Sequence, residues 1–258
     1  MMHILQSPRS RALLALVVLA SIGALLAAPL PTSQTVQFQS GDETVSAYLA
    51  LPASGGRHPA IIVIHEFWGL NDWIKQNSQK FADQGYVALA VDLYRGGVAT
   101  TPGDAQELMR ALPKDRAVRD LEAAFTYLAS RPDVDPTRIG AIGWCMGGGY
   151  SFQVAIHEPA LAACVVNYGA PPTDPADIAA IHAPILGNFG ADDMGITAAA
   201  VHTFAEAANA AHKSFDVKEY VGAGHAFENP NNTASYRPEA ADDAWNRITA
   251  FFAAQLKP

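Results

Sequence analysis

One glycine-rich stretch constrains the fold of this chain more than any other. Residues 139–142 predict a buried strand, and the sequence then continues Gly-Trp-Cys-Met-Gly, with Cys145 at its centre. A strand that passes into a helix within about three residues needs bare positions, because side chains at Gly143 and Gly147 would collide across the turn. The turn would put Cys145 at a helix N-terminus, where the helix dipole favours a thiolate. The alternative is a structural cysteine buried in a glycine-rich turn.

The G-x-C-x-G pattern has the form of a nucleophile elbow, the strand-turn-helix element of α/β-hydrolases, with cysteine in place of the usual serine. A thiol nucleophile needs a base to remove its proton and an acid to orient that base. In this fold the acid and then the histidine follow along the chain, each on a loop after a later strand. Asp192 and Asp193 follow one predicted strand, and His225 lies in a glycine-rich turn after the last. We favour Asp193, three residues after Gly190, as the acid. For His225 the alternative is a surface loop histidine.

A second cluster lies earlier in the chain, directly after the predicted strand 60–64. Residues 65–71 read His-Glu-Phe-Trp-Gly-Leu-Asn, at the position that supplies an oxyanion-hole amide in this architecture. We therefore expect the backbone N–H groups of Phe67 and Met146 to bind the oxyanion together. Glu66 is a carboxylate at the end of a buried strand and needs a partner. That partner is either an arginine such as Arg95, or the Cys145 thiol, whose protonation Glu66 would then control.

The rest of the chain predicts one α/β domain over residues 31–258. Apolar runs alternate with helical patterns, which indicates a mostly parallel sheet covered by helices on both faces, with an antiparallel hairpin at 35–38 and 44–51. The loops 94–104 and 171–181 are expected to be irregular and to border the pocket. The remaining expected strands are 60–64, 87–91, 139–142, 163–167, 184–189 and 215–220, and the expected helices are 72–83, 105–112, 115–130, 146–157, 198–211 and 238–256.

Composition limits the partners. A net charge of -8 over 258 residues, with no basic cluster, argues against nucleic-acid binding. The histidines and cysteines show no metal-ligand spacing, so we expect neither a metal nor another cofactor. Only Cys145 and Cys164 are present. We expect both to be free thiols, Cys164 as an inert core residue, and the protein to be a monomer.

The N-terminal residues 1–30 resemble an export signal. Arg9 and Arg11 precede an apolar run over residues 12–30. Small residues near Ala28 suit cleavage, whereas Pro29 is a poor start for a mature chain, and the run is long enough to span a bilayer. We therefore expect a periplasmic or secreted protein, or alternatively one held at the membrane by an uncleaved N-terminal helix.

Together these motifs resemble the dienelactone hydrolase family. The resemblance runs from about Val36 to the C-terminus and includes H-E-F-W-G-L-N, D-L-Y at residues 92–94, G-W-C-M-G-G, G-A-D-D and G-H-A-F, in family order and spacing. It implies an α/β-hydrolase with a triad of Cys145, His225 and Asp193. It also implies that Glu66 holds the resting thiol and takes its proton when substrate binds. The family's type reaction opens an enol-lactone to a carboxylic acid.

The substrate is where the chain departs from the family pattern. The resemblance implies two arginines that grip a substrate carboxylate, of which Arg95 could be one, but Asn229 stands where the second would fall. Candidate substrate contacts are Arg95, Trp68, Trp144 and Asn229. We expect a hydrolase that cleaves a small lactone or carboxylic ester through a cysteine acyl-enzyme. The alternatives are a general esterase or thioesterase on the same scaffold, or a non-catalytic envelope binding protein.

Overall fold

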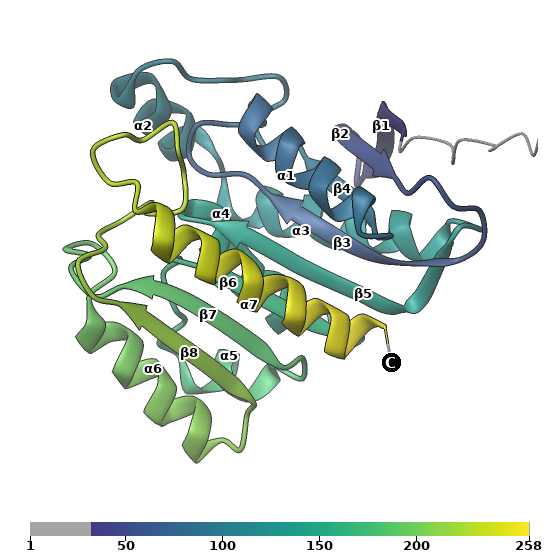
Figure 1. The fold of residues 1–258 in the computed structure, drawn as a ribbon. Coiled ribbons are helices and arrows are strands. Elements are labelled where there is room, and N and C mark those ends of the chain that lie inside the picture. Colours follow the sequence, from purple (N-terminus) through teal and green to yellow (C-terminus); the bar gives the residue numbers. More distant parts are fainter. Residues whose placement is uncertain (1–31, 258) are drawn as a thin grey trace, which may run out of the picture.

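The structure, a computed structural model, describes residues 32–257, so the predicted export segment lies outside the described residues. This part of the chain forms an eight-stranded sheet in the order β1-β2-β4-β3-β5-β6-β7-β8 (Figure 1). The strands are β1 Thr32–Ser40, β2 Glu43–Leu51, β3 His58–Ile64, β4 Val87–Val91, β5 Val134–Trp144, β6 Ala163–Asn167, β7 Ile185–Gly190 and β8 Phe215–Tyr220. The helices are α1 Asp72–Asp83, α2 Pro102–Ala111, α3 Lys114–Ser130, α4 Met146–His157, α5 Pro175–Ala180, α6 Ala198–Ala210 and α7 Pro238–Leu256.

The sheet is mostly parallel, as the alternation of apolar runs and helical patterns predicts. The hairpin of β1 and β2 is antiparallel and forms one edge, and β2 is also antiparallel to β4. From β4 to β8 every neighbouring pair is parallel. The residues of β4 and β6 are buried throughout, because helices cover both faces. The expected α/β-hydrolase architecture is therefore confirmed.

Two apolar layers hold the helices on the sheet. On one face, α1 and α7 pack through residues such as Ile74, Phe81 and Phe252 (Figure 1). On the other face, α3, α4 and α6 pack through residues that include Leu121 and Phe152. With both faces covered, the loops at the carboxyl ends of the parallel strands are where polar side chains can gather, as is general in open α/β sheets.

The largest differences from the expected elements lie in two places. Residues 175–180, expected to be irregular, form the short helix α5, in which Asp174 accepts a hydrogen bond from the Ala176 N–H and Pro175 lies at the first turn. Strand β5 begins at Val134, which pairs with His58 before a register shift. Of the helices in residues 32–257, none is both long and apolar enough to cross a bilayer.

Candidate active site

Cys145 lies at the sharp turn between β5 and α4. Its backbone has φ 55° and ψ -119°, a conformation that an L-residue rarely adopts. The turn is supported from β6, since the Cys145 N–H donates to the carbonyl of Asn167 at 3.0 Å. A Cβ on Gly143 would lie 2.1 Å from the Gly147 carbonyl oxygen, which is the collision that the sequence predicts.

Gly147 is required for a different reason from the expected one. A Cβ there would meet the carbonyl oxygens of Ile64 at 2.4 Å and His65 at 2.6 Å, which lie at the end of β3 rather than across the turn. The elbow therefore packs its backbone directly against the loop that begins with Glu66. This close approach is what brings the two predicted clusters together.

His225 and Asp193 come from the loops after β8 and β7. Nδ1 of His225 lies 2.7 Å from Oδ2 of Asp193, and the Asp193 side chain is almost wholly buried. The other carboxylate oxygen accepts the N–H groups of Gly195 and Ile196 at 2.8 and 3.0 Å. Asp192 is exposed. His225 is therefore paired with Asp193 and not with Asp192, and the donation from Nδ1 leaves Nε2 without a partner among these carboxylates.

Glu66 is buried among neutral partners. It accepts hydrogen bonds from Asn229 Nδ2 at 2.6 Å and from the Tyr168 hydroxyl at 3.4 Å. Burial raises the pKa of Glu66 to about 7, against the lowering effect of these two donors. The alternative of an ion pair with Arg95 is therefore wrong.

The Cys145 thiol lies where Glu66 and two backbone donors act on it. Burial, and next the charge of Glu66, raise the pKa of Cys145 to about 12. The nearby backbone N–H groups of Met146 and Phe67 lower the pKa of the sulfur, but by less. The sulfur thus rests as a thiol, and the two amides expected to bind an oxyanion converge on one point. The helix end is therefore outweighed, and burial, which the sequence argument did not include, is the largest effect on the Cys145 pKa.

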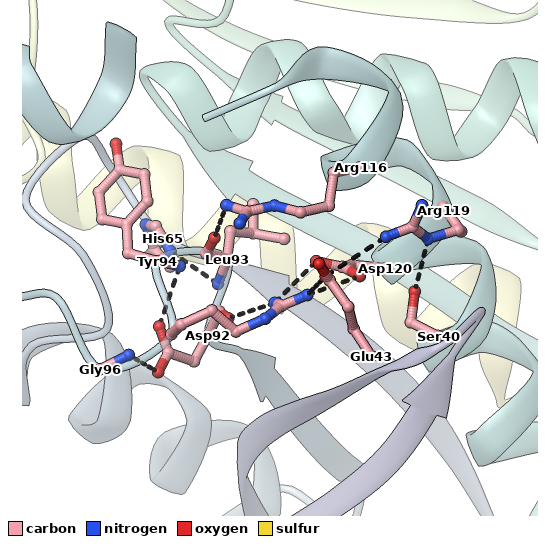
Figure 2. A network of polar contacts seen from close by, with 11 residues as sticks. Ser40, Glu43, His65, Asp92, Leu93, Tyr94, Gly96, Arg116, Arg119 and Asp120 are labelled. Carbon is pink, nitrogen blue, oxygen red and sulfur yellow. Dashed lines mark hydrogen bonds and ion pairs between the residues drawn. The ribbon is translucent and has the colours of Figure 1, made fainter. Parts of the chain in front are cut away.

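His65 was not assigned a role from the sequence, yet it positions the same loop. Its Nδ1 donates to the Glu66 carbonyl at 2.6 Å, and its Nε2 accepts the N–H of Leu93, at the end of β4, at 3.3 Å. Burial lowers the pKa of His65 and keeps the ring neutral, as this donor and acceptor pattern requires. Figure 2 shows His65 beside Leu93 and Tyr94.

A cleft of about 520 Å³ opens beside the loop after β3 that carries Phe67. Trp68 and Asn229, both expected to contact substrate, line it, and so does Phe67. The loop expected over residues 94–104 borders it through Ala99 and Thr100, and the Ala99 N–H is bonded to the Trp68 carbonyl. The cleft is completed by Asn71, Pro102, Asn231 and Asn232.

Arg95 does not line this cleft, and its expected role as a substrate contact is corrected. Its guanidinium binds the carboxylates of Asp120 at 2.8 Å and Glu43 at 2.9 Å. The Asp120 side chain is 0% exposed, so it needs this cation. The sequence could not show this, because Glu43 and Asp120 are distant along the chain.

Trp144 is also placed away from the cleft. Its side chain is buried against Trp73, with ring centroids 5.3 Å apart, and its Nε1 donates to Glu228 Oε2 at 2.8 Å. Burial and the nearby charge of Glu66 raise the pKa of Glu228 to about 8, opposed by the bond from Trp144. Glu228 was not predicted, although it lies three residues after His225. The site therefore contains two carboxyl groups that resist ionisation.

The second thiol lies apart from these groups. Cys164 is fully buried in β6, is not joined to Cys145, and donates weakly to the Ser151 carbonyl at 3.4 Å. Burial alone raises the pKa of Cys164. Over residues 32–257, no group of three or more histidine, cysteine or acidic side chains is arranged to hold a metal ion.

Comparison with known proteins agrees with this geometry. The sequence model of the dienelactone hydrolase family matches residues 45–256. The chain belongs to the dienelactone hydrolase family. A predicted carboxymethylenebutenolidase of Methylorubrum extorquens is 36% identical over 231 residues, which cover 84% of this chain and 79% of that protein. A predicted 2-oxo-3-(5-oxofuran-2-ylidene)propanoate lactonase of a Bradyrhizobium species is 34% identical over 229 residues, covering 84% and 92%.

A solved structure leads to the same conclusion. That of a predicted dienelactone hydrolase from Klebsiella pneumoniae superimposes with a TM-score of 0.80 at 30% identity, covering 86% of this chain and 98% of the other. Family membership confirms the resemblance drawn from the motifs. It also confirms that the chain is a hydrolase of the lactone and ester class, acting on a small-molecule substrate.

Proposed function

We propose that this chain hydrolyses a carboxylic ester or lactone through a thioester formed on Cys145, with His225, Asp193 and Glu66 as its partners. The observation that carries the proposal is the convergence of the Phe67 and Met146 N–H groups on the Cys145 sulfur. A carbonyl carbon attacked by that sulfur would place its oxygen near the same two donors. Such preorganised donors stabilise the oxyanion, and each is typically worth about two to three orders of magnitude in rate.

The first half of the reaction forms the acyl-enzyme. As substrate enters, Glu66 takes the thiol proton, and the resulting thiolate attacks the carbonyl carbon. Asp193 stabilises His225 as an imidazolium through Nδ1. The carbon–oxygen bond then breaks, and the leaving oxygen takes the proton from Nε2 of His225. The products of this half are the free alcohol, or the opened end of the lactone, and the Cys145 thioester.

The second half releases the acid. Neutral His225 removes a proton from water, and the hydroxide attacks the thioester carbonyl. The thiolate is expelled and recovers its proton from Glu66. This returns Glu66 to the carboxylate, Cys145 to the thiol and His225 to the imidazolium, so that the net change is one water added to one ester bond. Because the thiolate exists only during turnover, oxidation of Cys145 between turnovers is suppressed.

Selective alkylation tests the nucleophile. Cys145 is half-buried and Cys164 is fully buried, so iodoacetamide should inactivate the enzyme with one label per chain, on Cys145. Hydrolysis of p-nitrophenyl acetate should be abolished in Cys145→Ala and retained in Cys164→Ala. A label found only on Cys164, or full activity in Cys145→Ala, would reject Cys145 as the nucleophile, whereas no hydrolysis by the unmodified chain would favour a binding protein.

We also propose that the protein is exported and that it is a monomer. N-terminal sequencing of the protein from the cell-envelope fraction distinguishes a cleaved signal from an anchor. Light scattering of the purified protein gives the oligomeric state.

A further inference from the structure

The cleft beside Phe67 carries side-chain amides where a charge-binding site would carry cations. Four asparagines line it, and among its described lining residues none is an arginine, lysine or histidine. Asn231 is exposed and Asn232 is half-buried. Each side-chain amide offers both donors and an acceptor, which suits hydroxyl, ether and carbonyl oxygens but gives a carboxylate no counter-charge.

Arg95 and Asn229 stand at the two positions where the family resemblance implies arginines that bind a substrate carboxylate. Both side chains are bound to other residues of the chain. The Arg95 guanidinium is paired with Asp120 and Glu43. Asn229, at the other position, donates to Glu66 and accepts the N–H of Asn231 at 2.9 Å. Neither group is free to bind a substrate carboxylate.

Acidic side chains lie behind the wall of the cleft. Asn229, on the cleft wall, contacts Glu66, and Glu228 is its neighbour in sequence. Glu66 and Glu228 interact unfavourably as charges, and only neutral donors bind either of them. The chain as a whole carries a net charge of -8. A substrate carboxylate would therefore meet Glu66 and the negative net charge of the chain, with no basic side chain among the lining residues of the cleft to offset them.

We propose that this cleft selects uncharged lactones or esters with oxygen substituents, and discriminates against substrates that carry a carboxylate. Trp68 and Pro102 supply apolar walls for a ring or chain, and Thr100, Asn231 and Asn232 supply its hydrogen bonds. This inference rests on the proposed function and assigns its substrate class. It sets the chain apart from the two relatives described above, whose names both denote carboxylate-bearing lactones.

A matched pair of esters tests the selection. Mono-4-nitrophenyl glutarate carries a free carboxylate, and 4-nitrophenyl methyl glutarate has the same acyl chain with that carboxylate masked. With rates normalised to alkaline hydrolysis, the full chain should show a kcat/KM at least about tenfold higher for the masked ester at low ionic strength. The ratio should fall as salt is added, because screening weakens the repulsion.

A charge placed on the cleft wall provides the variant test. Asn231→Arg should lower the preference for the masked ester at least about fivefold, and the matched control Asn231→Gln should leave it unchanged. Equal or better hydrolysis of the free carboxylate by the unmodified chain, or a ratio unmoved by Asn231→Arg, would overturn the substrate class while leaving the hydrolase proposal intact. Failure to cleave either ester would instead count against the hydrolase proposal itself.

Discussion

Two carboxylate clusters at the ends of neighbouring strands show how the same kind of residue serves structure in one place and chemistry in another. In the loop after β4, Arg95 is paired with the buried Asp120 of α3 and also binds Glu43 of β2. After β3, Glu66 is equally buried but is bound only by an amide and a phenol. Burial without a cation is what raises the pKa of Glu66 to about 7. A paired carboxylate is a structural charge, whereas one that lacks a cation can exchange a proton near neutral pH.

Asp193 lies between these two cases and gives the largest expected effect. It is buried like Glu66, but its partner is the titratable ring of His225. Asp193→Asn should lower kcat by about two to four orders of magnitude, because the ring loses its orientation and its counter-charge. Steady-state kinetics on p-nitrophenyl acetate measure this loss.

Asp192→Asn is the matched control in the same loop. Asp192 is exposed, so its substitution should cost less than about tenfold, or about 1.4 kcal/mol. Reversed magnitudes would assign the acid to Asp192.

The next prediction compares Glu66 with the carboxylates that are paired with Arg95. Glu66→Gln should reduce kcat at least about a hundredfold, or about 2.7 kcal/mol, because the thiol loses its proton acceptor. Its Cys145 should nevertheless react faster with iodoacetamide at neutral pH without substrate, since a charge that raises the thiol pKa is removed. Burial remains, so the acceleration will be modest.

The paired cluster supplies the control for Glu66. Glu43→Gln, beside Arg95, should change neither kcat nor the alkylation rate, because Glu43 is bound far from the sulfur in the other network. Slower alkylation in Glu66→Gln would mean that Glu66 does not suppress the resting thiolate and acts as a structural or substrate contact.

Removing the cation should affect stability rather than catalysis. Arg95→Gln leaves Asp120 buried without a charge partner, and should lower the free energy of unfolding by about 2 kcal/mol. This figure is below the usual range for a buried pair, because the Arg95 side chain is 25% exposed. Urea denaturation gives the loss, and the folded variant should keep its kcat/KM on the neutral ester. If Arg95→Gln lowered kcat/KM only for the ester with a free carboxylate, Arg95 would be a substrate contact.

The sequence predicts the parts of the site that are set by local backbone geometry. The elbow at Cys145 follows from glycines that must be bare, and the positions of Asp193 and His225 follow from loops after successive parallel strands. The partners of Glu66 and Arg95 could not be predicted, because they come from segments up to 163 residues apart. Trp144 shows the same limit, since an aromatic residue next to the nucleophile faces the core, where it binds Glu228. Which carboxylate meets a cation is a property of the folded chain.

The smallest effect is a dependence of stability on pH that only the unpaired carboxyls should produce. Burial raises the pKa of Glu228 from 4.5 to about 8. A carboxyl whose folded pKa is raised binds its proton more tightly in the folded state, so the free energy of unfolding falls as the pH rises from about 4.5 to about 8.

Glu228→Gln removes this penalty and keeps an oxygen that can accept the Trp144 bond. It should leave stability unchanged at pH 4.5 and raise it by about 1 kcal/mol at pH 8, a reduced figure because Glu228 is only half-buried. Unfolding in urea at the two pH values, with Glu43→Gln as the paired counterpart, measures the difference. An equal gain at both pH values would show that the protonation state of Glu228 does not change between these two pH values. Glu228 would then differ from the carboxylates paired with Arg95 in its packing alone.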